Sequence, residues 1–177
     1  MTAAGDRSGR RLPPGVVPEV PGPGQESVWD YPRPPALLAD RRTVVVAFGG
    51  EVARTDRAYR VCETSHPPTW YLPRDAFAAG VLVPAEGRSL CEWKGQASYL
   101  DLVSPDGRVA SRAAWTYPTP TAAFAALADH VALYPGAVDE VTVAGEVVRA
   151  QPGTFYGGWV TDDVVGPFKG APGSMGW

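Results

Sequence analysis

The stretch from residue 80 to 118, GVLVPAEGRSLCEWKGQASYLDLVSPDGRVASRAAWTYP, decides the fold class of this chain. Its apolar residues come in short runs separated by turn residues, which is typical of short strands. The clearest turn is SPDGR at 104–108, where Asp-Gly at the centre favours a tight β-hairpin. We therefore predict three strands here, near 88–93, 96–103 and 108–116.

Strand patterns continue on both sides of this stretch. RTVVVAFGG at 42–50 is rich in β-branched residues, and EVARTD behind it is expected to pair back as a hairpin. RAYRVCET at 57–64 alternates with period two, HPPTWYLP is bounded by proline, and DEVTVAGEVVRAQ is expected to turn at Ala144–Gly145. The sum of about eight short strands predicts a mainly β protein of antiparallel sheets, either a sandwich or a partly open barrel.

One short helix is expected in this strand-rich chain. An alanine-rich stretch at roughly 121–128 favours helix, and Thr121 is a candidate for its N-cap. The chain contains 20 glycines and 19 prolines, which again indicates many turns and short elements.

The length of 177 residues is enough for one domain with a core of its own. Residues 1–26 are rich in Gly, Pro and Arg without periodicity, and we expect a disordered N-terminal arm. Residues 27–150 form the expected β domain. Residues 151–177 are Gly-rich yet hold several aromatic residues, so we expect this C-terminal extension to pack on the domain.

The charge pattern argues against two classes of partner. A net charge of −3, with basic residues scattered singly or in pairs, disfavours nonspecific binding to nucleic acid or to an anionic membrane. No apolar run approaches the roughly 20 residues that span a bilayer, and the N-terminus lacks the apolar segment of a secretory signal. We expect a cytoplasmic protein with a small-molecule partner, and leave a homodimer open.

The sequence contains no motif that is typical of a metal site or a cofactor site. Cys62 and Cys91 provide neither a disulfide framework nor a C-x-x-C pair for zinc. With His66 and His130 as the two histidines, a metal site would need Asp or Glu ligands that no pattern identifies. We expect no metal and no cofactor.

The two lysines, Lys94 and Lys169, share one local context. Each follows an aromatic residue and precedes a glycine, whereas the other 14 basic residues are arginines. The chain also lacks Ile and Asn, which indicates a GC-rich coding bias under which lysine drifts to arginine. A retained lysine points to a need for its compact ammonium, whose pKa shifts on burial. Chance retention is the alternative.

Four stretches, ETSHPPTWYLPRD, CEWKGQASY, AAWTYPTP and VDEVTVAGEVV, resemble in order and spacing the family catalogued as domain of unknown function 427. The family is also labelled nucleotidyltransferase-like, and the resemblance runs from about Glu26 to Gln151. It implies a β-tent (Mss4-like) architecture, in which two antiparallel sheets are pinned at one end and splayed at the other. Some proteins of that architecture bind zinc through cysteine pairs, which this chain lacks. It also lacks the Gly-rich phosphate loop and the paired acids expected for nucleotidyl transfer.

Glu63, Lys94 and Tyr71 are the candidate catalytic residues. Glu63 shares a strand face with Val61, which we assign to the interior, and a buried carboxylate needs a partner. It is either a general acid or base, a member of a structural ion pair, or an acceptor for backbone N–H groups in the Thr64–Pro67 turn. Lys94 is its expected partner, or else binds an anionic ligand, acts as an amine, or extends its head into water. Tyr71 is a candidate proton donor.

Several further residues are candidates for ligand binding. The aromatic ones suit a stacking wall, although ordinary core packing is the alternative. A thiol near an ammonium is a candidate reactive group, a loop histidine a candidate ligand contact, and the second lysine a candidate for a flap over the pocket. These residues are Trp93, Trp115, Tyr117, Cys91, His66 and Lys169.

Three functional hypotheses follow. The first is a small-molecule site between the splayed sheets, with metal-independent acid–base chemistry such as proton transfer, cyclisation, hydration or hydrolysis. The second is a ligand- or peptide-binding module without catalysis. The third is nucleotidyl transfer, which predicts dependence on a nucleotide and Mg²⁺.

Overall fold

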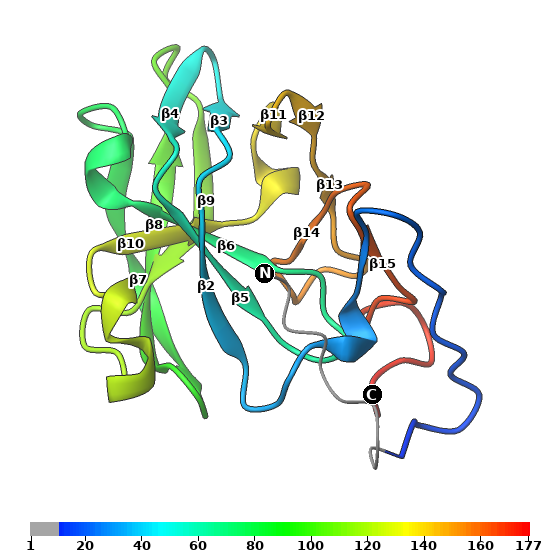
Figure 1. Ribbon diagram of the computed structural model, residues 1–177. Helices are drawn as coiled ribbons and strands as arrows, with labels where there is room; N and C mark the ends of the chain where they lie inside the picture. Colours follow the sequence, from blue (N-terminus) through cyan, green and yellow to red (C-terminus); the bar gives the residue numbers. More distant parts are fainter. Residues whose placement is uncertain (1–10) are drawn as a thin grey trace.

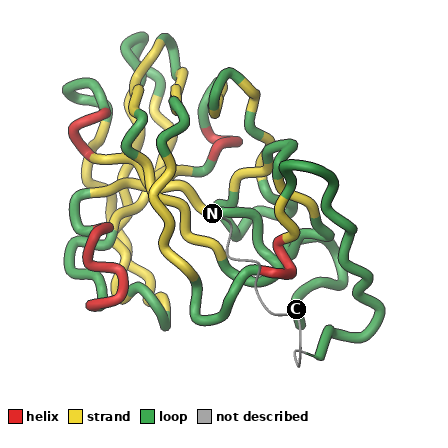
Figure 2. Tube along the Cα trace, viewed as in Figure 1, coloured by secondary structure: helices red, strands yellow, loops and turns green. Residues whose placement is uncertain are grey.

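The structure, a computed structural model, describes residues 11–177. Residues 1–10 of the predicted disordered arm lie outside the described residues. Strands and loops dominate the described chain, and its helical segments are short 3-10 helices (Figure 1, Figure 2). These are η1 (Val28–Asp30), η2 (Arg74–Ala76), η3 (Ala122–Leu127) and η4 (Pro135–Ala137). The prediction of a mainly β protein is confirmed.

Two open antiparallel sheets form the body of the described chain, one of seven strands in the order β2-β5-β6-β10-β9-β8-β7 and one of four in the order β12-β11-β3-β4. The seven strands are β2 (Ala36–Asp40), β5 (Ala58–Cys62), β6 (Thr69–Pro73), β7 (Leu82–Cys91), β8 (Gly95–Val103), β9 (Val109–Thr116) and β10 (His130–Leu133). The four strands are β3 (Val44–Ala47), β4 (Glu51–Thr55), β11 (Glu140–Val143) and β12 (Glu146–Val147). Two short pairs complete the described strands: β1 (Glu26–Ser27) runs parallel to β15 (Val164–Val165), and β13 (Arg149–Ala150) runs antiparallel to β14 (Trp159–Val160).

The predicted hairpins are present. β8 and β9 pair across the SPDGR turn, where the amide of Ser104 donates to the carbonyl oxygen of Arg108 at 2.9 Å. β11 and β12 pair across Ala144 and Gly145, whose φ angles are +50° and +83°. Two consecutive left-handed residues match the twist of a tight hairpin.

Two details differ from the sequence prediction. β7 begins at Leu82 rather than near 88 and contains Pro84, which an edge strand accommodates because one of its sides needs no hydrogen-bond partner. The helix expected at 121–128 is the 3-10 helix η3, interrupted by non-helical backbone at Phe124. So short a helix depends on packing more than on alanine propensity, and the buried side chains of Phe124 and Leu127 hold it in place.

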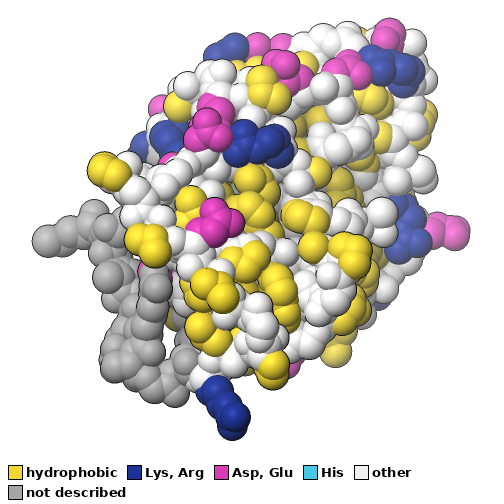
Figure 3. Space-filling view, turned by 90° about the vertical axis from the view of Figure 1, so that its right-hand side faces the viewer, with side chains coloured by type: hydrophobic (Ala, Val, Ile, Leu, Met, Phe, Trp, Pro, Cys, Tyr) yellow, Lys and Arg dark blue, Asp and Glu magenta, His cyan; other side chains and the backbone are white. Residues whose placement is uncertain are grey.

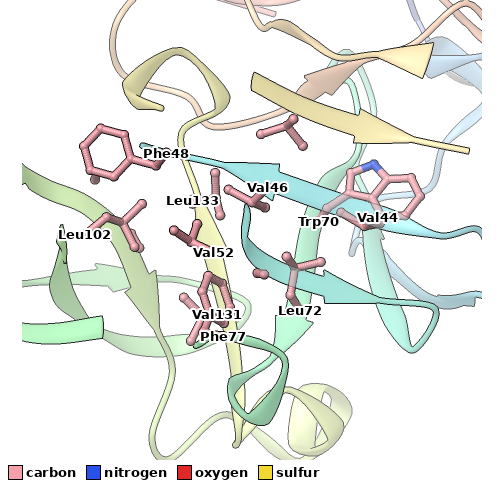
Figure 4. Close-up of a cluster of buried hydrophobic side chains, with 14 of the residues drawn as sticks. Val44, Val46, Phe48, Val52, Trp70, Leu72, Phe77, Leu102, Val131 and Leu133 are labelled. Carbon is pink, nitrogen blue, oxygen red and sulfur yellow. The ribbon is translucent and has the colours of Figure 1, made fainter. Parts of the chain in front are cut away.

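The main core lies between the two sheets and is built of buried apolar side chains. Strand alternation supplies it, because every second residue of a strand points to the same face. Figure 4 shows Val44, Val46 and Val52 of the smaller sheet together with Trp70, Leu72, Val131 and Leu133 of the larger one. The buried side chains of this cluster fill the space between the two sheets.

The terminal segments pack together beside the larger sheet (Figure 1). The indole N–H of Trp29 donates to the carbonyl oxygen of Pro167 at 2.9 Å, and its ring lies 5.5 Å from that of Trp177. Arg60 of β5 forms ion pairs with Asp40 at 3.0 Å and with Glu26 at 3.2 Å. Figure 3 views this side of the molecule, where apolar side chains gather below most of the charged ones. The N-terminal segment is thus tied to both the sheet and the C-terminal segment.

Within residues 11–177, no helix has the length and apolar character needed to cross a lipid bilayer.

Candidate functional site

A cavity of about 590 Å³ opens on the face of the seven-stranded sheet that points away from the main core. Its floor is formed by Tyr71 of β6 and Trp115 of β9, which alternate with the core residues Leu72 and Ala114. The expectation of a pocket between the sheets is therefore wrong. The space between the sheets is filled by the apolar core, and the opposite face of the larger sheet is left to form the site.

Three chain segments build walls around this floor. The loop between β5 and β6 contributes Glu63 and His66, and the tip of the β7–β8 hairpin contributes residues 91–94. The C-terminal segment closes another side with Gln151, Phe155, Tyr156, Gly157 and Lys169. All nine residues singled out from the sequence line this one cavity: Glu63, Lys94, Tyr71, Trp93, Trp115, Tyr117, His66, Cys91 and Lys169.

The β7–β8 hairpin holds Lys94 in place. Cys91 pairs with Gly95, so residues 92–94 form a three-residue loop closed by a glycine with φ of +100°, a left-handed conformation that favours glycine. Thr121 fastens the loop from outside: its amide donates to the carbonyl oxygen of Lys94 at 3.1 Å, and its hydroxyl to that of Trp93 at 2.6 Å. Thr121 therefore does not use its side chain as the predicted N-cap of η3.

Lys94 is buried, with 9% of its surface exposed, and its Nζ lies 5.6 Å from the ring centroid of Tyr117. Among residues 11–177 it forms no ion pair. Burial works against its charged form, but Tyr71, Cys91 and Glu63 outweigh burial and raise the pKa of the Lys94 ammonium above its ordinary value. Lys94 is therefore a cation at neutral pH, which does not suit the alternative role of a neutral amine.

Two tyrosine hydroxyls lie beside this cation. The rings of Tyr71 and Tyr117 are 6.3 Å apart, and both side chains line the cavity. Burial raises the pKa of Tyr71, and the opposing effect of the Lys94 charge does not cancel it. Burial likewise raises the pKa of Tyr117. Both groups are therefore protonated at neutral pH and able to donate a hydrogen bond.

Glu63 faces the cavity but pairs with Arg33 rather than with Lys94. The guanidinium of Arg33 lies 3.2 Å from its carboxylate, and both side chains are partly exposed. The register explains this partner: Ala36 of β2 lies opposite Cys62 of β5, so residues just before β2 lie beside those just after β5. The expected Glu63–Lys94 ion pair is thus wrong, although both residues line the same cavity. The sequence had placed Glu63 within a strand, whereas in the structure it follows the end of β5.

His66 and Lys169 form the side of the cavity nearest the C-terminal segment. The His66 ring packs edge-on against Tyr156 at 4.8 Å, and its Nδ1 donates to the carbonyl oxygen of Thr64 at 3.0 Å. Burial lowers the pKa of His66, which is therefore neutral at pH 7. The ammonium of Lys169 donates to the main-chain oxygen of Trp177 at 2.7 Å. The two lysines thus differ, because Lys169 donates to a main-chain oxygen, whereas Lys94 has the thiol of Cys91 within hydrogen-bond reach.

The C-terminal segment approaches the sheet closely. A Cβ atom placed on Gly157 would come within 2.3 Å of the Trp115 ring, so only glycine fits this contact. Gln151 fixes the segment by donating to the carbonyl oxygen of Lys169 at 2.8 Å and accepting from the amide of Gly158 at 3.0 Å. Sequence reasoning missed Arg33, Gln151 and Gly157 as parts of this site. The Gly-Gly pair after Phe155 and Tyr156 was the available signal for a close backbone approach.

Cys91 and Trp93 complete the cavity lining, and the other cysteine and the other histidine lie apart from it. Cys91 and Trp93 are partly buried in the apolar cluster on the cavity side of the sheet. Cys62 is buried elsewhere, against the terminal segments. His130 lines a separate recess of about 250 Å³ with Arg41 and Arg57. In the described part of the chain, no three His, Cys, Asp or Glu side chains are grouped so as to hold a metal ion.

The fold and cavity define a mainly β protein of two open antiparallel sheets with an aromatic-lined site on the outer face of the larger one. Residues 36–144 match the model of the family described as domain of unknown function (DUF427). The match covers more than half of the 177 residues, and the chain belongs to this family. A search of curated proteins found no match. Arg33 and the C-terminal wall of the cavity lie outside the matched segment.

Proposed function

We propose that this protein binds a small organic molecule in the cavity on the outer face of its larger sheet. One observation carries the proposal: a cavity of about 590 Å³ combines aromatic walls with buried polar groups. Ligand sites in proteins typically measure about 300 to 1,000 Å³ and are mostly apolar with a few convergent polar groups. This combination is the one expected for recognition of a small molecule.

The aromatic walls support a planar or amphipathic ligand. The rings of Trp115 and Tyr134 are 4.8 Å apart, and Trp93 and Tyr99 add two more aromatic surfaces to the lining. Aromatic rings bind flat apolar groups by stacked or edge-to-face contacts. The apolar part of the ligand therefore has several surfaces to pack on.

Metal-independent acid–base catalysis is a second candidate, favoured by the two potential proton acceptors that line the cavity. Glu63, paired with Arg33, and the neutral imidazole of His66 both line the site. A carboxylate and a neutral imidazole at one cavity are groups that general-base catalysis uses. Turnover that falls by orders of magnitude in Glu63→Gln, with little change in ligand affinity, distinguishes an enzyme from a binding module.

The test of binding is a screen of planar organic compounds, nucleotides with Mg²⁺ included, by saturation-transfer NMR. The variant Thr69→Trp adds an indole to the cavity lining, whereas Val109→Trp adds one at an exposed position outside it. We expect ligands of the wild type to lose binding in Thr69→Trp and to keep it in Val109→Trp. Binding that is insensitive to Thr69→Trp, or no binding by any compound, contradicts the proposal.

A second measurement uses the wild-type protein alone, so its result does not depend on whether a variant folds. The chain has six tryptophans, of which Trp93 and Trp115 line the cavity while Trp70 and Trp159 belong to the main core. Ligand binding to the wild type is expected to shift the indole N–H signals of the first two more than those of the second two. The reverse order contradicts binding at this site.

A further inference from the structure

Lys94 is the least compensated charge at the cavity. It is nine-tenths buried, and no carboxylate of residues 11–177 lies within ion-pair distance of its ammonium. A buried charge is costly unless it is paired, so proteins rarely keep one without a partner. The position of Lys94 is also enforced, since Gly95 and Thr121 fix the hairpin that carries it.

The other charges around the cavity do not supply the missing partner. Glu63 is engaged by Arg33, and Lys169 donates to the main-chain oxygen of Trp177. Glu92 lines the cavity too, but it is exposed at the tip of the hairpin and forms no ion pair with Lys94. The deep part of the cavity is therefore electropositive.

Hydroxyl donors accompany the cation. Tyr71 and Tyr117 line the same part of the cavity, and both are protonated at neutral pH because burial raises the pKa of each. Tyr71 and Tyr117 also lie within hydrogen-bond reach of each other. The ammonium and a hydroxyl of this pair together match the oxygen atoms of an oxyanion, which accept charge-assisted and neutral hydrogen bonds together.

The mouth of the cavity is apolar. Leu90 and Phe155 line it with 81% and 78% of their surfaces exposed, and they come from different walls, the β7 strand and the C-terminal segment. Exposed apolar side chains of this size at the rim of a site favour an apolar part of the ligand. The cavity thus has a cationic interior and an apolar entrance.

We propose that the ligand is an aromatic or amphipathic organic anion whose oxyanion group binds the ammonium of Lys94 while its apolar part contacts Trp115, Leu90 and Phe155. This inference rests on the proposed small-molecule function and names the class of ligand. Carboxylate and phosphate monoester groups share the required chemistry, and the experiment separates them.

The two lysines make a direct test available. Protein with isotope-labelled lysine side chains gives two ε-methylene signals, Lys94 and Lys169, which the variant Lys169→Met assigns. The probes are three matched sets: 2-naphthoate against 2-naphthamide, phenyl phosphate against phenol, and inorganic phosphate alone. We expect naphthoate or phenyl phosphate to shift the Lys94 signal, and to bind at least about tenfold tighter than its neutral partner, the factor expected for one charge-assisted contact. The more effective of the two anions identifies the oxyanion group.

Variants separate charge from packing. Lys94→Met keeps an unbranched stem and removes the charge, so we expect a loss of about tenfold or more in anion affinity and a change below about threefold for the neutral amide. Lys94→Arg is expected to retain a preference for the anion. Arg74→Met is the matched control, because it removes a positive charge at an exposed position outside the cavity, and the expected change is below about threefold for both probes. Without ligand, Lys94→Met is expected to melt no lower than the wild type, because it removes an uncompensated buried charge.

Each contrary result overturns a defined part of the inference. Equal affinity for an anion and its neutral partner overturns the anion inference and leaves small-molecule binding intact. A response to inorganic phosphate as large as that to aryl anions overturns the organic part. If no anion moves the Lys94 signal at millimolar concentration, the inference fails, and if the compound screen also finds no ligand, the proposed function fails with it.

Discussion

The two faces of the seven-stranded sheet differ in kind although the same strands supply both. One face is packed against the smaller sheet and presents aliphatic and aromatic side chains such as Leu72 and Leu133. The other presents Tyr71 and Trp115 to a cavity that also holds a buried ammonium, Lys94. Strand alternation thus separates stability from the proposed ligand binding at the level of neighbouring residues. A substitution at one position should affect one property and leave the other largely unchanged.

The largest expected effect comes from adjacent residues of β6. Leu72→Ala removes a side chain with no exposed surface from the main core, and we expect a loss of about 2 to 5 kcal/mol in the free energy of unfolding. Tyr71→Phe keeps the ring and removes only a hydroxyl at the cavity, and we expect a loss below about 1.5 kcal/mol. Chemical denaturation of both variants measures the difference. Similar losses in the two would show that the cavity face is as important for stability as the core.

Much of this two-faced sheet was readable from the sequence. The Asp-Gly turn at 104–108 and the Ala144–Gly145 turn identified their hairpins because tight turns restrict the local backbone. Period two placed Glu63 on the face of Val61, and both line the cavity. Alternation, however, gives two faces without saying which one the second sheet covers. The sequence analysis therefore expected the site between the two sheets, whereas it lies on the outer face of the larger sheet.

For a related reason, the residues that meet across the cavity could not be predicted from the sequence. Arg33 reaches Glu63 through the β2–β5 register, and Gln151 and Gly157 bring the C-terminal segment onto Trp115 from far along the chain. Such contacts depend on how whole segments dock, and no local propensity encodes docking. The aromatic content of residues 151–177 indicated burial without indicating which surface receives it.

An intermediate effect is expected where the C-terminal segment meets the cavity floor. Gly157→Ala places a methyl group against the Trp115 ring, and such overpacking typically costs about 1 to 3 kcal/mol. We expect faster amide hydrogen exchange in residues 151–170 and no comparable change in the strands of the main core. Gly176→Ala is the control, because its added methyl group would meet no atom within 4 Å. Equal protection in both variants would show that Trp115 moves aside without loosening the segment.

The smallest expected effect is a pH dependence at the cavity face, where the imidazole of His66 forms part of the wall. Burial lowers the pKa of His66 from its ordinary 6.5; Glu63 and the hydrogen bond to Thr64 oppose this, while Lys169 and Arg33 reinforce it. The unfolded chain therefore binds more protons at His66 than the folded one just below pH 6.5. Its contribution to stability is present above that pH and is lost as the pH falls through the folded value. The lowered pKa of Asp40 acts in a more acidic range, below its ordinary 3.8.

Denaturation of wild type and His66→Gln at neutral pH and near pH 5 isolates this contribution. We expect the free energy of unfolding to fall more steeply with acid in the wild type, by less than either substitution effect above. His130→Gln is the matched comparison, because burial also lowers the pKa of His130 but in a recess apart from the cavity. The two imidazole signals seen by NMR, assigned with the same variants, give both pKa values directly. A His66 that titrates at or above 6.5 would mean that water reaches the ring from the cavity, and that the Tyr156 wall does not seal this side of the site.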